Sequence, residues 1–235
     1  MTITLADAFV PLTQRDDVTH VGTLEAADKA RQNKPSLEAF CVSVSEHPEE
    51  WMAIARIGGA PTWSLSRPGS VWLHVLALTK AQEAAIIDWG VAEGLAEPTT
   101  LWRSWFYDSE ADRMAYTQWN DEISARNQID EDDEDACVDH IDSHRLTPVG
   151  MALLERWRDD KTCLDGLTIL WADRVLAPQL PELAGLWWDE DYAPDNLSCP
   201  RGGILPSRLD GFTRSRIELD MGVDHDWYDA SVDQP

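Results

Sequence analysis

The stretch Thr19-His20-Val21-Gly22-Thr23, with helix-forming residues behind it as far as Arg31, decides the predicted fold. β-branched residues lead into a histidine, a glycine and a threonine. Thr23 is a good N-cap, so the pattern predicts a strand that ends here and a helix over 23–32. Glycine keeps the backbone open at such a turn, and the first N–H groups of a helix are unpaired. The stretch therefore fits either a nucleotide-like ligand beside His20 or an ordinary strand-to-helix turn with a hydrogen-bonded histidine.

The charge balance excludes several classes of partner. The chain has 235 residues with a formal net charge of −24, from 43 acidic and 19 basic side chains. Nucleic acids and anionic membranes are bound through lysine and arginine, so we expect no direct nucleic-acid partner and no membrane partner. Hydrophobic residues make up 43%, which is typical of a globular protein. The charge fits either simple solubility or imitation of a nucleic acid.

The spacing of the cysteines and the hydropathy pattern indicate the cellular compartment in which the protein is expected. The four cysteines are far apart and form no Cys-x-x-Cys pair. The N-terminus has no apolar signal-peptide region, and no apolar run approaches the roughly 18 residues of a membrane span. We therefore expect free thiols in a reducing cytosol, which predicts a cytoplasmic protein.

A second segment with alternating residues follows the first. Phe40 to Ser45 alternates apolar and small side chains, which predicts a strand. Ser45 is a candidate N-cap for a helix over 46–57, because acidic residues favour its first turn. Two further strands are expected at 61–65 and 71–76.

The middle of the chain, residues 79–160, is expected to be a mostly helical insertion. Helices are predicted at 79–90, around Trp102 to Phe106, at 108–127 and at 148–158. The acidic block Asp130-Glu131-Asp132-Asp133-Glu134-Asp135 reads as a solvated loop. Cys137-x-x-His140-x-x-x-His144 could place ligands on one helical side, but it lacks a fourth ligand, so we predict no metal site.

The C-terminal part combines apolar and acidic stretches. Residues 164–176 are expected to form an apolar strand and a short helix, 196–206 a loop, and 212–219 a closing strand. Trp187-Trp188-Asp189-Glu190 lies between the expected short helix and the expected loop. Residues 220–235 are acidic without hydrophobic periodicity, which predicts a tail.

Taken in order, three segments resemble the ADP-ribosyltransferase superfamily. They are His20-Val21-Gly22-Thr23, the strand Phe40 to Ser45 with the helix behind it, and Trp187-Trp188-Asp189-Glu190. The resemblance implies an α+β fold in which a split pair of antiparallel sheets binds NAD in a central cleft. It divides the chain into residues 1–78 and 161–219 as two halves of the core, 79–160 as the insertion and 220–235 as the tail.

The resemblance also implies roles for individual residues. Cleavage of the bond between nicotinamide and ribose develops positive charge, which a nearby carboxylate stabilises. Glu190 is the first choice for this carboxylate and Asp189 the second. His20 would bind the adenosine-side ribose, and Gly22 and Thr23 would approach the nicotinamide amide. The implied cleft wall contains Ser43 or Ser45.

Functions from other classes remain open. A non-enzymatic acidic inhibitor would occupy the basic groove of a DNA- or RNA-binding complex, if its carboxylates were spaced like phosphates. An immunity or antitoxin protein would share the same acidic signature. All of these functions predict a protein partner with a basic surface, whereas the transferase alone predicts NAD.

Overall fold

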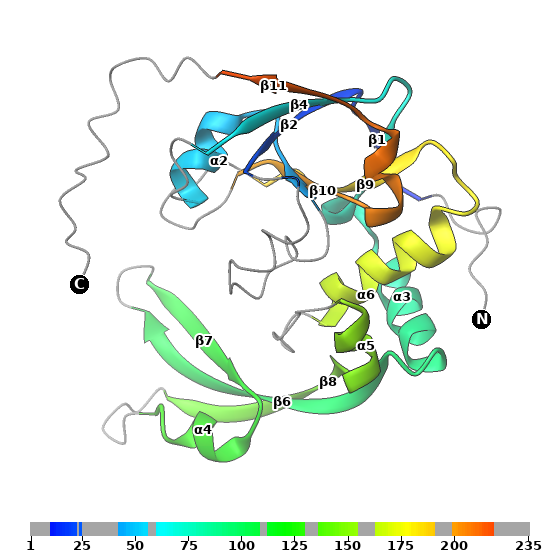
Figure 1. Cartoon of the computed structure of the whole chain (residues 1–235). Coiled ribbons are helices and arrows are strands. Elements are labelled where there is room, and N and C mark those ends of the chain that lie inside the picture. The colour runs from blue at the N-terminus through cyan, green and yellow to red at the C-terminus, as the bar shows by residue number, and fades with distance from the viewer. Residues whose placement is uncertain are drawn as a thin grey trace. The chain divides into compact units, whose positions relative to one another are not determined.

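The computed structural model describes residues 10–22, 24, 42–55, 60–108, 112–129, 136–154, 163–190 and 199–218. These residues form a mixed α+β protein with three sheets (Figure 1). The chain divides into two units. The described residues of the inserted unit lie within Leu78–Gln179. The two-sheet unit takes its described residues from Val10–Asn33, Cys41–Ala77 and Leu180–Pro235. The sequence analysis had placed the second boundary at 160/161 rather than at 179/180.

The first sheet of the two-sheet unit has the strand order β1-β5-β9-β10-β3. Its strands are β1 (Leu12–Gln14), β5 (Val71–His74), β9 (Leu183–Trp188), β10 (Arg201–Ile204) and β3 (Val42–Val44). Neighbouring strands are antiparallel except for β5 and β9, which are parallel. The second sheet has the order β11-β4-β2 and is antiparallel. Its strands are β11 (Thr213–Ile217), β4 (Thr62–Ser66) and β2 (Asp17–Val21).

Short helices complete this unit. They are α2 (Pro48–Ala55), η3 (Val75–Ala77) and η7 (Pro206–Gly211). The strand expected before Gly22 is present as β2, and the helix expected after Ser45 is present as α2. The helix predicted over 23–32 and the tail 220–235 lie outside the described residues, as does the acidic block 130–135.

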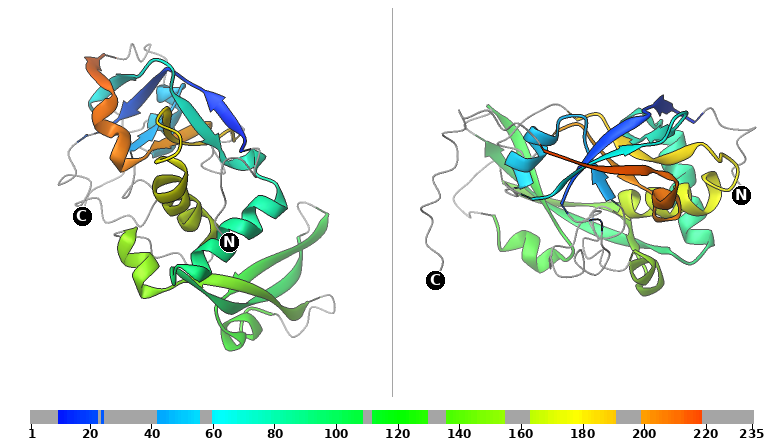
Figure 2. Two further views of the ribbon diagram at one scale, coloured as in Figure 1. Left: turned by 90° about the vertical axis from the view of Figure 1, so that its right-hand side faces the viewer. Right: turned by 45° about the horizontal axis from the view of Figure 1, so that its top comes forward.

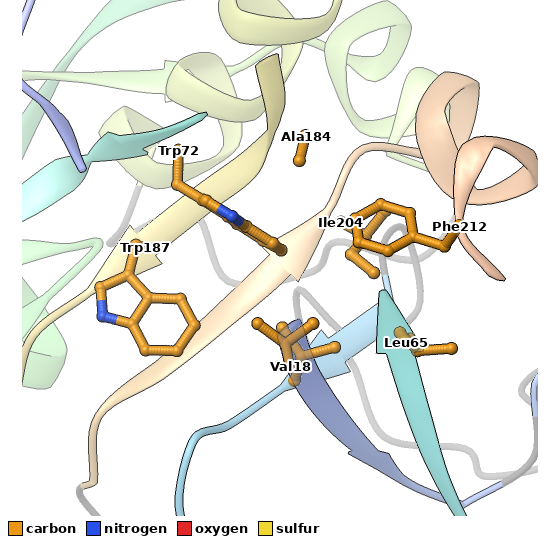
Figure 3. Packing of buried hydrophobic residues seen from close by; sticks show 8 residues of the cluster. Val18, Leu65, Trp72, Ala184, Trp187, Ile204 and Phe212 are labelled. Atoms are coloured by element: carbon orange, nitrogen blue, oxygen red, sulfur yellow. The ribbon is translucent and has the colours of Figure 1, made fainter. Parts of the chain in front are cut away.

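Two tryptophans of the first sheet, packed against residues of the second sheet, form the core of the two-sheet unit. Trp72 and Trp187 are fully buried, with ring centroids 5.8 Å apart in an edge-to-face arrangement. Figure 3 shows these rings gathered with Val18 and Leu65 of the second sheet and with Phe212. Edge-to-face geometry is favoured because the positive ring edge meets the negative ring face.

The predicted loop over 196–206 is wrong where β10 forms. A Cβ on Gly202 would lie 2.5 Å from the Trp187 ring, so only glycine allows the ring to pack there. A Cβ on Gly185 of the neighbouring strand would lie 2.1 Å from the carbonyl oxygen of Gly203. Glycine-rich sequence suggested a turn, but here it makes room for tryptophan inside a sheet.

The inserted unit contains a second kind of structure that the sequence analysis missed. Its sheet has the strand order β7-β6-β8 and is antiparallel (Figure 1). The strands are β6 (Ala96–Asp108), β7 (Arg113–Trp119) and β8 (Cys137–Leu146). The mostly helical insertion expected over 79–160 is therefore wrong for this sheet. Alternating aromatic and β-branched residues favour a strand over a helix, and the period of two prevails here.

Helices form the rest of the inserted unit. They are α3 (Lys80–Ala92), α4 (Glu122–Arg126), α5 (Pro148–Leu153), α6 (Cys163–Trp171) and the π-helix η5 (Ala172–Leu176). The predicted capped helix after Thr79 and the helix starting at Pro148 are confirmed. The strand expected within 164–176 is wrong, because α6 is a helix. Its residues are nearly all buried, and an apolar run without periodicity fits either element.

The length and composition of the described helices determine whether any of them can span a bilayer. None of them combines the length and the apolar composition that crossing a membrane would need.

Candidate functional site

The two sheets of the two-sheet unit meet through the backbone where β2 passes the end of β3. The N–H of Thr19 donates to the carbonyl of Ser45 at 2.9 Å, and the N–H of Ser45 donates to the carbonyl of Thr19 at 2.8 Å. The residue after Thr19 is His20, and the residue before Ser45 is Val44 of the core. The first two segments singled out in the sequence therefore lie side by side.

Ser45 ties this junction to β10 and to the helix α2. Its buried hydroxyl donates to the carbonyl of Pro200 at 3.0 Å and accepts from the N–H of His47 at 3.0 Å. The expected N-cap role of Ser45 is wrong, because α2 begins at Pro48 and the hydroxyl bonds the N–H of His47 before the helix, but Ser45 does hold the residue before Arg201. Ser43 lies on β3 opposite Gly203. Thr23 lies outside the described residues.

His20 is buried on β2 opposite Trp63 of β4. Gly22 follows with φ of +120°, a value that L side chains rarely adopt. A Cβ there would lie 3.5 Å from Nε2 of His20. The carbonyl of Gly22 accepts from Nε1 of Trp63 at 3.1 Å, and its N–H donates to Pro61 at 2.8 Å. The turn is thus fixed from both sides while the backbone beside the imidazole carries no side chain.

The third segment reaches the same region through β9 and β10. Trp188 is opposite Arg201 in register, and Glu190 forms a bidentate ion pair with Arg201. Nη1 and Nη2 of Arg201 donate to the two carboxylate oxygens at 2.6 and 3.1 Å. The side chain of Glu190 is only 25% exposed, so the pair is shielded from solvent more than most surface pairs are.

Asp189 lies on the side of Arg15 rather than of Arg201. Its Oδ1 is 4.0 Å from Nη2 of Arg15, and its side chain is 56% exposed. Arg15 also forms an ion pair with Glu46, and its guanidinium lies 3.9 Å from the centroid of the Trp187 ring. The two candidate carboxylates therefore have different partners and differ in exposure.

Several buried polar atoms of this unit have no hydrogen-bond partner among the described residues. They include Nε of Arg15, Oε2 of Glu50 and Nε1 of Trp187. Leaving such an atom unpaired costs about 1–3 kcal/mol, which a ligand or a water molecule recovers by supplying the partner. Their presence near the charged residues is consistent with a site that binds a polar ligand.

The sequence analysis missed the two arginines. Arg201 falls within the segment expected to be a loop, and Arg15 belongs to none of the predicted motifs. In a chain with 43 acidic and 19 basic side chains, each arginine is expected to pair with a carboxylate. Composition therefore predicts that each arginine has a carboxylate partner, but it does not predict which carboxylate that is.

The proposed ligand pattern Cys137-x-x-His140-x-x-x-His144 lies on β8, not on a helix. Successive residues of a strand point to opposite faces, and Cys137 and His140 are three positions apart, so their side chains point to opposite faces of the strand. No cluster of three metal-ligating side chains occurs in the part of the chain that the structure describes. Cys137 and Cys199 are free thiols, as expected.

Comparison with known proteins does not identify the chain. No family model matches it, and neither a curated protein nor a solved structure does.

Proposed function

We propose that the protein is ADP-ribosyltransferase-like, binds NAD in its two-sheet unit, and modifies or docks to a protein partner. One observation carries the proposal. Three segments that are far apart in the sequence are linked in series through neighbouring residues: Thr19 pairs with Ser45, Ser45 bonds Pro200, and Arg201 pairs with Glu190. These segments lie in a unit of two sheets, of which one is antiparallel and the other contains the parallel pair β5 and β9.

The residues present are compatible with a dinucleotide. Gly22 leaves the backbone open beside His20, where a ribose hydroxyl or an amide can approach closely. Arg15 and Arg201 are each already paired with a carboxylate, Glu46 and Glu190, so they add no net positive charge for a diphosphate. The buried unpaired atoms of Arg15 and Trp187 offer further donors.

The roles proposed for His20, Gly22 and Thr23 come from the resemblance, and the described contacts bear only on Ser45 and Glu190. His20 orients the ribose, and Gly22 with Thr23 approaches the nicotinamide amide. Ser45 positions α2 and β10 rather than touching the ligand, because its hydroxyl is already used twice. Glu190 supplies the carboxylate that stabilises positive charge developing at the ribose, and Arg201 holds it in a single orientation.

The test measures NAD binding and label transfer separately. The full chain is incubated with labelled NAD and a lysate, and binding to the purified protein is followed by calorimetry. Wild type is compared with His20→Ala, Glu190→Gln and Asp189→Asn. Asp210→Asn is the matched control, since Asp210 is an exposed carboxylate that pairs with Arg214 in the same unit.

We expect His20→Ala to weaken NAD binding. Glu190→Gln should retain binding but lose transfer by about 100-fold or more, because the charge it provides acts in the transition state. Asp210→Asn should behave as wild type. The proposal is wrong if the wild-type protein neither binds NAD nor breaks it down. Melting curves of each variant establish that the fold is intact.

A further inference from the structure

The sheet of the inserted unit carries large aromatic side chains on one face. In antiparallel register, Trp105 is opposite Tyr116 and Tyr107 is opposite Met114. Residues directly opposite one another share a face, as do alternate residues of one strand. Arg103 lies on the same face, two residues before Trp105. We call Arg103, Trp105, Tyr107, Met114 and Tyr116 the aromatic face.

The other face of this sheet is occupied in part. Ser104, which points the opposite way from Trp105, donates its hydroxyl to the carbonyl of Ala125 in α4 at 2.6 Å. Ala125 is fully buried. Figures 1 and 2 show α4 against the β6-β7-β8 sheet on one side only. The face of Ser104 also carries the aromatic rings of Phe106 and of Trp102 opposite Trp119, and Phe106 is 40% exposed, so α4 covers that face only in part.

The aromatic face is exposed to an unusual degree. Tyr107, Met114 and Tyr116 are 45%, 43% and 47% exposed. The face runs over residues 103 to 107 of β6, about 13 Å of extended strand. Contiguous apolar surface rimmed by polar residues is typical of an interaction site.

The face is also held rigidly. Arg103 forms a bidentate ion pair with Asp139 of β8, in which Nε donates to Oδ1 at 2.7 Å. Its guanidinium lies 5.0 Å from the Trp105 ring centroid and 5.4 Å from that of Tyr116. The hydrogen bond from Arg103 holds the pKa of Asp139 below its ordinary value, so the pair stays charged near neutral pH. A preorganised surface loses little entropy when a partner binds.

Charge identifies the kind of partner. The described residues within 96–146 contain seven acidic and four basic side chains, a net charge of −3. Three of the four arginines already pair with carboxylates of the unit, through the pairs Arg103–Asp139, Arg126–Glu122 and Arg145–Glu97. The remaining charge around the aromatic face is therefore negative, and aromatic ring faces also attract cations.

We infer that the aromatic face docks a cationic segment of a protein partner, whose arginine or lysine side chains stack on Trp105 and Tyr116. A nucleic acid would be repelled by the surrounding carboxylates. A second copy of this chain would bring another net charge of −24. The inference is independent of the proposed NAD site, because the face belongs to the inserted unit.

The test uses the full chain and a fluorescein-labelled peptide of about 12 residues, alternating arginine and glycine. Fluorescence anisotropy is measured in about 0.15 M NaCl, where charges farther apart than about 8 Å are largely screened. The double variant Trp105→Ser/Tyr116→Ser removes the two rings on which the cationic side chains stack. Ile123→Ser is the matched control, since Ile123 is 73% exposed on α4 at the covered face. All of these variants keep the net charge unchanged.

We expect the double variant to bind the peptide at least about tenfold more weakly, and Ile123→Ser to bind it as wild type does. Equal binding by wild type and the double variant would overturn the inference, because charge alone would then explain it. Absence of wild-type binding at this salt concentration would also overturn it. A wild-type dimer that dissociates in the double variant, seen by sedimentation, would assign the face to self-association instead. If the double variant fails to fold, the single variant Tyr116→Ser, at a ring that is 47% exposed, takes its place under the same criteria.

Discussion

Two cysteines of this chain show how burial alone changes the chemistry of a residue type. Cys199 is fully buried beside β10, whereas Cys137 is exposed at the start of β8. Burial raises the pKa of Cys199 to about 11, because removing a thiolate from water is unfavourable. The thiolate is the reactive form, so the two residues should differ strongly in reactivity.

We expect iodoacetamide at about pH 8 to alkylate Cys137 much faster than Cys199, which lacks both access and ionisation. Peptide-resolved mass spectrometry over time measures both rates in one sample. Equal rates under native conditions would contradict the buried position of Cys199. In urea the difference should disappear. Because the folded pKa of Cys199 is raised, its contribution to stability should be lost as pH rises from about 9 towards 11.

Gly185 provides a second prediction at the scale of one residue. Gly185→Ala would place a methyl group 2.1 Å from the carbonyl oxygen of Gly203 and 2.7 Å from the Trp72 ring. Neither can move without disturbing the core, so we expect a loss of at least about 2 kcal/mol in the free energy of unfolding. Gly211→Ala is the control, because its added carbon would be 3.5 Å from the flexible side chain of Arg67. Urea unfolding measures both. A Gly185→Ala protein as stable as the control would refute this packing.

At the scale of elements, local signals predicted the starts of α3 and α5, but they also predicted helices at 102–106 and over 108–127, where β6 and β7 form. Thr79 and Gln82 form a capping box at the start of α3, in which the two residues cap one another's backbone. Such a signal lies within four residues and needs no distant partner. The strands β6 and β7 depend on one another, and their aromatic residues also fitted an apolar helix face. Pairing across the hairpin decided between the two.

The capping box of α3 is testable by itself. We expect Thr79→Ala to lower the free energy of unfolding by about 1 kcal/mol, because it leaves the N–H of Gln82 without its acceptor. Lys80→Ala is the neighbouring control, since the Lys80–Glu83 pair is exposed and should contribute less than about 0.5 kcal/mol. Chemical unfolding followed by tryptophan fluorescence gives both values. Equal losses in the free energy of unfolding for the two variants would show that the Thr79 cap stabilises the protein no more than the exposed ion pair does.

For the molecule as a whole, the net charge of −24 opposes compaction by self-repulsion. We expect the melting temperature to rise as NaCl increases from about 0.01 to about 0.15 M, because the Debye length falls from about 30 to about 8 Å. KCl should act equally, and the rise should level off at higher salt. A melting temperature that falls or stays constant over this range would contradict net repulsion as a limit on stability.

The sequence by itself determined what depends on composition and on neighbours along the chain. The acidic charge, the strand leading to Gly22, the capped start of α3 and the helix start at Pro148 all follow from residues within a few positions of one another. These features form because short-range hydrogen bonds and backbone preferences act before any tertiary contact is made.

Only the tertiary structure decided which distant residues share a site. Glu190 was chosen from sequence as a carboxylate, but its pairing with Arg201 depends on the register of β9 with β10. The aromatic face likewise exists only once β7 pairs with β6. Strand pairing joins residues far apart in the chain, and packing selects one register from many with similar local preferences. That selection has no local signature, so it could not be read from the sequence alone.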